Sequence, residues 1–143
     1  KDKINILFGG AFSNLRKNVA LAHAALEIVN REVINLIEMR GFNREQVTQL
    51  FCGCDMLLLP TKSEGSPQVL KEAMAYNCPI VATDVADIAY LLDGVSNSYV
   101  TSFDPKDVAA KIQQVIACGE RTNGRERRTT LYIEGTTIPA PEK

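Results

Sequence analysis

Short strand-like apolar runs alternate with helix-like segments over the first 120 residues, and this alternation restricts the fold more than any other feature. Parallel strands are joined by a crossover of a dozen or more residues, usually a helix, and such crossovers are almost always right-handed. The expected strands are residues 4–8, 33–37, 56–59, 79–83 and 98–100, and the expected helices are residues 18–30, 43–53, 67–76, 87–92 and 105–119. The pattern predicts a doubly wound, Rossmann-like α/β domain with helices on both faces of a parallel sheet.

Three of these helices have clear start signals. Asn43 is followed three residues later by Gln46, which is the spacing of a capping box. Ser66-Pro67 and Asp104-Pro105 each place a capping side chain before a proline at the first helical position.

The composition fits one folded domain with no nucleic-acid partner. The 143 residues carry 16 basic and 17 acidic side chains, a formal net charge of −1, which gives no general attraction to phosphate backbones or anionic lipids. No apolar run approaches the ~20 residues that span a bilayer, and no signal peptide is visible. The chain begins without an initiator Met, so we expect a piece of a longer, cytoplasmic protein.

The cysteines are too few for a disulfide scaffold in a chain of this size: they are Cys52, Cys54, Cys78 and Cys118. Cys52 and Cys54 are close in sequence, but no second cysteine pair or histidine cluster accompanies them, and we expect no metal site. We expect all four to be small buried thiols in a reducing cytoplasm.

The strand and helix pattern ends near residue 120. We expect residues 1–120 to form the domain and residues 121–143 to form a poorly ordered or divergent tail. The tail has a basic run at Arg125, Arg127 and Arg128, followed by Gly, Thr and two prolines. Such a run is typical of a solvated segment, and a contact with an anion is the alternative.

Ligands of open parallel sheets bind beyond the carboxyl ends of the strands, and three loops there carry suitable residues. The first runs from Gly9-Gly10 to Arg16-Lys17, the second is Glu64-Gly65-Ser66, and the third is Thr83-Asp84. The second loop leads into a helix N-terminus, which favours an anion, and Lys17 could add a full positive charge. The combination predicts a diphosphate site.

Glu64 and Glu72 flank the start of the same helix. Carboxylates bind hydroxyl groups well, and a nucleotide sugar has hydroxyls on both sides of its diphosphate. The spacing alone leaves two interpretations open: a pair of hydroxyl-binding carboxylates, or two solvated glutamates beside a helix start.

The run from Leu59 to Ala75, continued by Cys78-Pro79-Ile80-Val81-Ala82-Thr83-Asp84-Val85, closely resembles the donor-binding half of the family-4 (group 1) retaining glycosyltransferases of the GT-B fold. The shared pattern is a Glu, seven residues and a second Glu that begins Glu-Ala-Met, followed by a Pro-Ile-Val-Ala-Thr strand. The similarity extends back to Lys17-Asn18 and forward to the helix start at Asp104-Pro105.

The resemblance implies a role for each matching residue. Glu64 would contact the donor sugar and Lys17 would neutralise the departing diphosphate, which makes these two the catalytic candidates. Glu72 would hold the ribose hydroxyls. The expected donor-binding residues are Gly10, Arg16, Gly65, Ser66, Pro67, Gln68 and Glu72. A GT-B enzyme needs no metal, so the donor is the expected ligand, without a metal or other cofactor.

The chain departs from the family in two places. The family has Gly-Arg after the first strand, whereas Ala11 follows Gly10 here, and Arg16 is our candidate for the missing charge. The chain is also short by about one helix–strand unit between the helix at 18–30 and Val33. It would therefore be a shortened half of a GT-B architecture.

The leading hypothesis is the C-terminal, nucleotide-sugar-binding domain of a bacterial hexosyltransferase in polysaccharide biosynthesis. The full-length enzyme would need an N-terminal acceptor-binding domain and would use a glycan or glycolipid acceptor, with peripheral association at the inner face of the membrane. The domain alone is expected to transfer little. The main alternative is a non-catalytic nucleotide-binding module or remnant; a nucleotide-sugar epimerase and a pure interaction domain rank lower.

Overall fold

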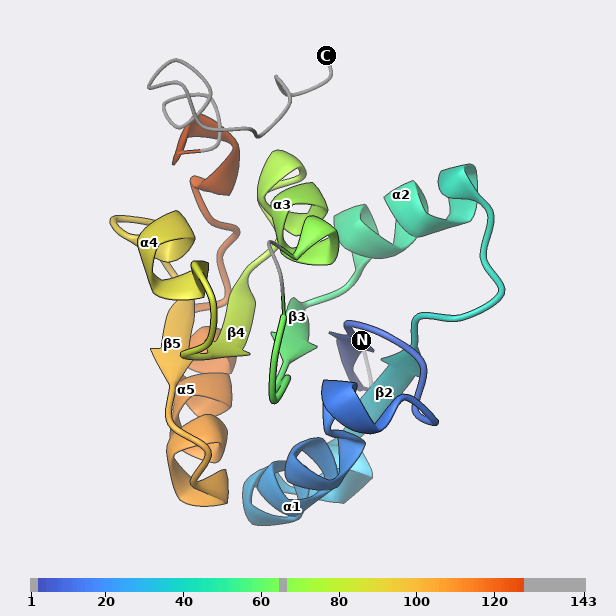
Figure 1. The fold of residues 1–143 in the computed structure, drawn as a ribbon, viewed down its shortest axis with the longest axis vertical. Helices are drawn as coiled ribbons and strands as arrows, with labels where there is room; N and C mark the ends of the chain where they lie inside the picture. The colour runs from blue at the N-terminus through green and yellow to red at the C-terminus, as the bar shows by residue number, and fades with distance from the viewer. Residues whose placement is uncertain (1–2, 65–66, 128–143) are drawn as a thin grey trace.

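The computed structural model describes residues 3–64 and 67–127. Its strands are β1 (Ile4–Phe8), β2 (Ile34–Glu38), β3 (Met56–Leu59), β4 (Ile80–Thr83) and β5 (Tyr99–Thr101). Its helices are α1 (Val19–Val29), α2 (Arg44–Gly53), α3 (Gln68–Ala75), α4 (Ile88–Leu92) and α5 (Pro105–Cys118), with 3-10 turns η1 (Leu15–Lys17) and η2 (Arg31–Val33). Each predicted strand and helix is present, with bounds that differ by at most one residue (Figure 1).

The described strands form one parallel sheet in the order β2-β1-β3-β4-β5. The chain moves outward from β1 to β2, then crosses back to place β3 on the other side of β1. The carboxyl ends of β1 and β3 therefore flank the point where the strand order reverses, which is where such sheets bind ligands. This five-stranded order is one of the common doubly wound arrangements, and the expected shortening by one helix–strand unit stays a prediction.

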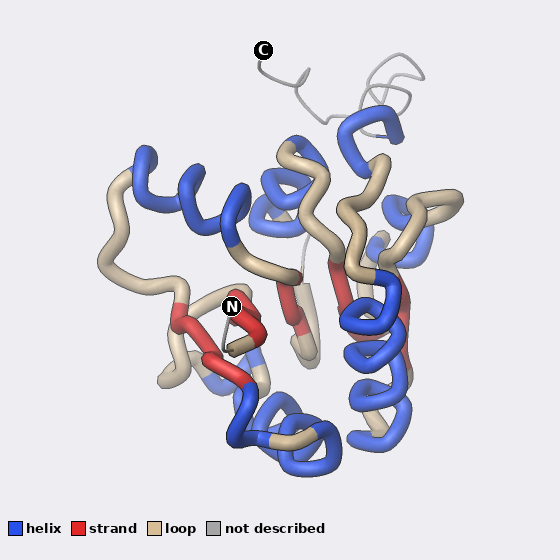
Figure 2. Tube along the Cα trace, turned by 180° about the vertical axis from the view of Figure 1, so that it is seen from behind, coloured by secondary structure: helices blue, strands red, loops and turns tan. Residues whose placement is uncertain are grey.

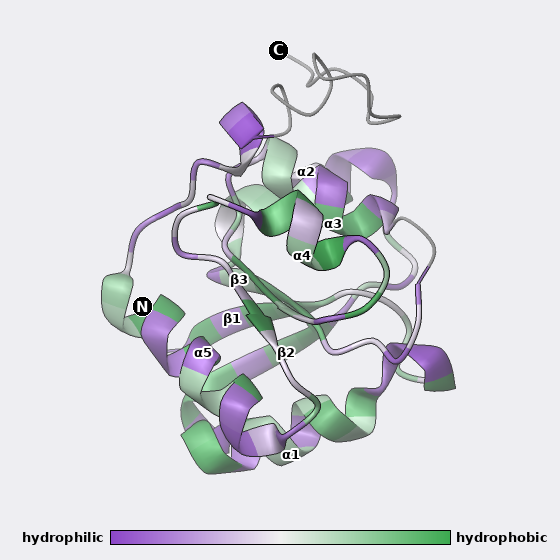
Figure 3. Cartoon of the chain, turned by 60° about the vertical axis from the view of Figure 1, so that its left-hand side comes forward, coloured by the Kyte–Doolittle hydropathy of each residue, from purple (hydrophilic) through white to green (hydrophobic). Residues whose placement is uncertain are grey.

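Helices cover both faces of the sheet. Strand residues alternate between two apolar clusters: Leu7 and Leu57 face α2, α3 and α4, whereas Phe8 and Leu58 face α1 and α5. Figure 1 shows α1 and α5 below the strands and α2, α3 and α4 above them, and Figure 2 shows the same layers from behind. In Figure 3 the helices carry hydrophobic and hydrophilic residues side by side, as expected for helices with one face on the sheet.

Two of the three predicted helix starts are confirmed. The amide of Gln46 donates to the Asn43 side chain (2.8 Å), and the Asn43 amide donates to the Gln46 side chain (3.0 Å), completing the capping box. Asp104 accepts from the amide of Lys106 (2.9 Å), with a proline in the first turn of α5. In α3, however, Pro67 is the N-cap rather than the first helical residue, because its ψ of 115° is extended. Ser66, the predicted cap, lies outside the described residues.

Residues 121–127 lie against the domain. Arg121 donates to the carbonyls of Phe51 (2.7 Å), Cys54 (2.9 Å) and Tyr76 (3.1 Å), and residues 124–127 form a helical turn. Figure 1 shows this segment running from α5 toward α3 and α4. Arg128 and the rest of the predicted tail lie outside the described residues, so the boundary near residue 120 stays a prediction.

None of the helices within 3–64 and 67–127 is long and apolar enough to cross a membrane.

Candidate functional site

An ion pair joins the two loops that leave the sheet at its point of reversal. Lys17 lies at the end of the loop after β1, and Glu64 lies in the loop after β3. Lys17 Nζ is 2.5 Å from a carboxylate oxygen of Glu64, and the two side chains are only 14% and 8% exposed. The structure thus brings together the two residues that the sequence nominated as catalytic, although they are 47 positions apart.

Gly10 makes room for the lysine side chain. A Cβ atom at residue 10 would lie 2.8 Å from Cγ of Lys17, which is closer than carbon atoms pack. The sequence suggested Gly10 as a point of backbone approach to a ligand, a role that stays a prediction. What the geometry adds is that Gly10 lets the aliphatic part of Lys17 cross the loop toward Glu64.

The loop after β1 is also held at its middle. The Phe12 amide donates to a carboxylate oxygen of Glu38 (2.8 Å), and Glu38 is the last residue of β2. Asn14 caps η1 by accepting from the Arg16 amide (3.1 Å), and Asn18 adopts a left-handed conformation between η1 and α1. These contacts fix the path of the backbone into Lys17.

Two buried threonines, Thr61 and Thr83, make hydrogen bonds within and between the loops that carry the ion pair. The Thr61 hydroxyl lies 3.0 Å from the Arg16 carbonyl and 2.9 Å from the Ser63 carbonyl. The Thr83 hydroxyl donates to the Thr61 carbonyl (2.6 Å). Thr61 was not among the predicted site residues. The sequence signal for it is a polar residue two positions beyond the last residue of a fully buried strand.

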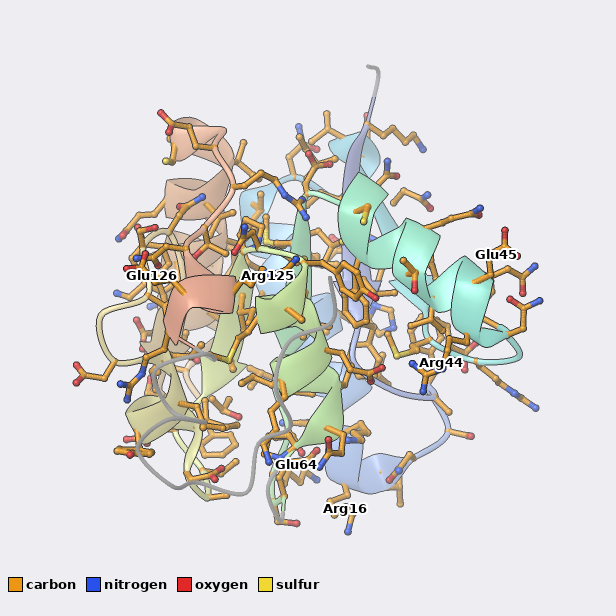
Figure 4. The ribbon with its side chains drawn as sticks, turned by 90° about the horizontal axis from the view of Figure 1, so that it is seen from above. Arg16, Arg44, Glu45, Glu64, Arg125 and Glu126 are labelled. Atoms are coloured by element: carbon orange, nitrogen blue, oxygen red, sulfur yellow. The ribbon has the colours of Figure 1, made fainter. Side chains whose placement is uncertain are left out.

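The remaining candidates have different environments. Figure 4 shows Arg16 pointing outward from its loop and Glu64 near the start of α3, and Arg16 is exposed. Pro67 is buried, and Gln68 is exposed in the first turn of α3. Glu72 is partly buried on α3, about 6 Å along the axis from Gln68. Gly65 and Ser66 lie outside the described residues.

The site combines three features that suit a diphosphate with hydroxyl groups beside it. Lys17 provides a positive charge with three N–H donors, of which Glu64 uses one. The α3 N-terminus provides amides that have no partner within the helix, and a partial positive charge. Glu64 and Glu72 provide hydroxyl acceptors near the start of α3 and one turn into it. Over the described residues, no three His, Cys, Asp or Glu side chains gather as metal ligands would.

Solved structures share this fold. Sucrose-phosphate synthase from Thermosynechococcus elongatus is 20% identical with a TM-score of 0.73, and the match covers 88% of this chain and 40% of that one. WaaG, a glycosyltransferase involved in lipopolysaccharide biosynthesis, is 17% identical with a TM-score of 0.69, covering 99% of this chain and 45% of that one. The domain therefore has the Rossmann-like fold of one half of a GT-B glycosyltransferase.

Curated relatives give the same assignment by sequence. An uncharacterized glycosyltransferase of Methanocaldococcus jannaschii is 30% identical over 107 residues, which is 74% of this chain and 28% of that protein. The D-inositol 3-phosphate glycosyltransferase of Mycolicibacterium vanbaalenii is 32% identical over 84 residues, or 58% of this chain and 19% of that protein. The matches thus span less than a third of either relative.

The family described as "Glycosyl transferases group 1" matches residues 11–118. The matched segment includes Lys17, Glu64 and Glu72, and it extends from the loop after β1 to the end of α5. The chain therefore belongs to the group 1 glycosyltransferase family.

Proposed function

We propose that this domain binds the nucleotide-sugar donor of a retaining glycosyltransferase that transfers a hexose to a glycan or glycolipid acceptor. The observation that carries the proposal is the contact between Lys17 and Glu64 at the point where the strand order reverses. Family membership supports the reaction class, and this contact supports a donor site between the two loops.

Lys17 is the proposed diphosphate ligand. Its ammonium group can keep one N–H on Glu64 and direct the others to phosphate oxygens. When the bond between the sugar and the diphosphate breaks, negative charge builds up on the departing phosphate. A fixed positive charge stabilises that charge in the transition state more than in the ground state, which is what accelerates a reaction.

The two glutamates are proposed to bind the groups on either side of the diphosphate. Glu64, next to Lys17, would accept from hydroxyls of the sugar, and Glu72, further along α3, would accept from the ribose. Arg16, Gly10 and the turn from Gly65 to Gln68 complete the proposed donor site. No metal is part of this mechanism.

A second domain is proposed to supply the acceptor. The curated relatives are several times longer than the region they share with this chain, and the matched part of two solved structures is 40% and 45% of their length. We place the complete protein at the inner face of the cytoplasmic membrane, because the proposed glycolipid or polysaccharide acceptors are assembled there.

Calorimetric titration of the chain with UDP, GDP and ADP tests the proposal. We expect one of the three to bind with a micromolar dissociation constant. Lys17→Met and Glu72→Gln should each weaken that binding about tenfold, the equivalent of losing one charge-assisted hydrogen bond.

Matched controls remove the same charges elsewhere. Lys111, which pairs with Asp107 on α5 (3.4 Å), is changed to Met, and the exposed Glu27 of α1 is changed to Gln; both should bind like the unaltered chain. Failure of a folded sample to bind any of the three nucleotides contradicts the proposal. Normal binding combined with an inactive full-length enzyme would instead favour the non-catalytic module.

A further inference from the structure

We propose that Thr61 is a positioning residue that holds Lys17 in place for the donor diphosphate. This inference rests on the proposed function and concerns the same site. The Thr61 hydroxyl lies within hydrogen-bond distance of the backbone carbonyl that precedes Lys17 and of the one that precedes Glu64.

Thr61 contacts the loop that carries Lys17. The Arg16 carbonyl accepts from the Thr61 hydroxyl (3.0 Å) and from the Lys62 amide (2.9 Å). This carbonyl belongs to the peptide bond that leads into Lys17, so its position fixes where the lysine side chain begins. Thr61 is 45 residues away in sequence, and the contact therefore ties two separate loops together.

Thr61 also contacts the backbone of the loop that carries Glu64. The Ser63 carbonyl lies 2.9 Å from the same hydroxyl and belongs to the peptide bond that leads into Glu64. A hydroxyl has one proton to donate, so at any instant Thr61 donates to Arg16 or to Ser63. The Thr61 side chain therefore holds the backbone before Lys17 and the backbone before Glu64 at a fixed distance from each other.

Thr61 is itself held in place by burial and by a hydrogen bond from β4. Thr61 and Thr83 are both 0% exposed, so water does not reach either hydroxyl to replace a lost contact. The Thr83 hydroxyl donates to the Thr61 carbonyl (2.6 Å), and Thr83 is the last residue of β4. The chain of contacts thus runs from the sheet through Thr61 to the residues before Lys17 and Glu64.

The experiment measures affinity for whichever of UDP, GDP or ADP binds the unaltered chain. Thr61→Val keeps the size and branching of the side chain but removes its proton donor, and we expect binding to weaken about five- to tenfold. Thr61→Ser restores the hydroxyl and should bind within about twofold of the unaltered chain.

Thr101 offers a matched control. It is a buried threonine (3% exposed) at the end of β5, and its hydroxyl donates to the adjacent Ser102 carbonyl (2.8 Å). Thr101→Val removes a comparable bond outside the two loops and should leave the affinity unchanged. Equal losses in Thr61→Val and Thr101→Val would overturn the inference, because the effect would then be one of general stability.

A double-mutant cycle separates positioning from folding. If Thr61 acts through Lys17, Thr61→Val should cause no further loss in a Lys17→Met background. A loss of the same size in both backgrounds would overturn the inference. Thr83→Val removes the hydrogen bond from β4 to the Thr61 carbonyl but leaves the Thr61 hydroxyl in place. It should weaken binding in the unaltered chain and cause no further loss in the Lys17→Met background. This variant replaces Thr61→Val if Thr61→Val does not fold.

The outcomes distinguish the two proposals. If no nucleotide binds the unaltered chain, both fail. If a nucleotide binds and Lys17→Met weakens it, while Thr61→Val binds normally, the proposed function stands and the role of Thr61 is rejected.

Discussion

Two of the cysteines form a buried contact, and the other two face solvent. The Sγ atoms of Cys54 and Cys78 are 3.5 Å apart, whereas Cys52 and Cys118 are exposed. The prediction that all four are buried is wrong for Cys52 and Cys118, because these lie on outward-facing positions of α2 and α5. The hydrogen bond with Cys54 and burial raise the pKa of the Cys78 thiol, and the hydrogen bond from Cys78 lowers the pKa of Cys54.

We expect two thiols of the folded chain to react rapidly with a maleimide at pH 7.5, and two more only after unfolding in urea. The thiolate is the reactive species and must meet the reagent, which burial prevents at Cys54 and Cys78. Mass spectrometry of the labelled peptides identifies the modified residues. In a Cys52→Ser, Cys118→Ser chain the rapid phase should disappear; rapid labelling of a third thiol in the unaltered chain would be inconsistent with the packing at Cys54 and Cys78.

At the scale of single elements, α5 carries its own acid-sensitive contact. The Asp107 carboxylate accepts from the Ser102 amide (2.7 Å) in the loop before the helix and lies 3.4 Å from Lys111. The hydrogen bond from the Ser102 backbone is the main reason that the pKa of Asp107 lies below its usual value. The charged carboxylate is therefore more favourable in the folded chain than in the unfolded chain.

Asp107→Asn should lower the free energy of unfolding by about 0.5 kcal/mol at pH 7, a small value because solvent screens the carboxylate. The folded pKa is depressed, so this stabilisation is present above the unfolded value of about 3.9. It is lost as the pH falls through the folded pKa. Urea titrations of both proteins between pH 7 and pH 2 measure the difference, which should vanish at the acid end; a constant difference down to pH 2 would assign it to packing instead.

The elements were predictable because their signals are local. The capping box at Asn43 and the Asp104-Pro105 start depend on residues within four positions of each other, and the alternation of strands and helices depends on periodicity. The start of α3 was shifted by one residue because Pro67 is compatible with both an N-cap and a first helical position.

The site was predictable only in part. Lys17 and Glu64 were nominated through the resemblance, but their contact across 47 residues depends on the strand order. Thr61 was missed for a related reason: its hydroxyl acts on the carbonyl of Arg16, and any residue type would present that carbonyl. Every residue has a backbone carbonyl, so the sequence does not indicate which side chain will donate to a given one.

At the scale of the whole molecule, residues 121–127 connect the two helix layers. They follow α5 on one face of the sheet and bind elements of the other face. Arg121 reaches carbonyls at the ends of α2 and α3, where the helix dipoles favour a positive charge. Arg127 donates to the Tyr90 carbonyl (2.7 Å) and lies 5.2 Å from the centre of the Tyr90 ring.

Arg121→Met should lower the free energy of unfolding by about 2 kcal/mol, because hydrogen bonds from a charged group to three carbonyls are lost together. Urea unfolding followed by circular dichroism measures the change. Arg44→Met, which removes an exposed guanidinium from the first turn of α2, should alter stability by less than about 0.5 kcal/mol. Equal stability of the Arg121→Met chain and the unaltered chain would mean that these contacts contribute nothing net.

The Arg121 contacts also have a consequence for folding during synthesis. Phe51 and Cys54 are translated 70 and 67 residues before Arg121, whose guanidinium donates to their carbonyls. A nascent chain therefore exposes these groups until residue 121 has left the ribosome, long after β1, β2 and β3 can pair. The contacts of Arg121 with α2 and α3 therefore form only after most of the described domain has been translated.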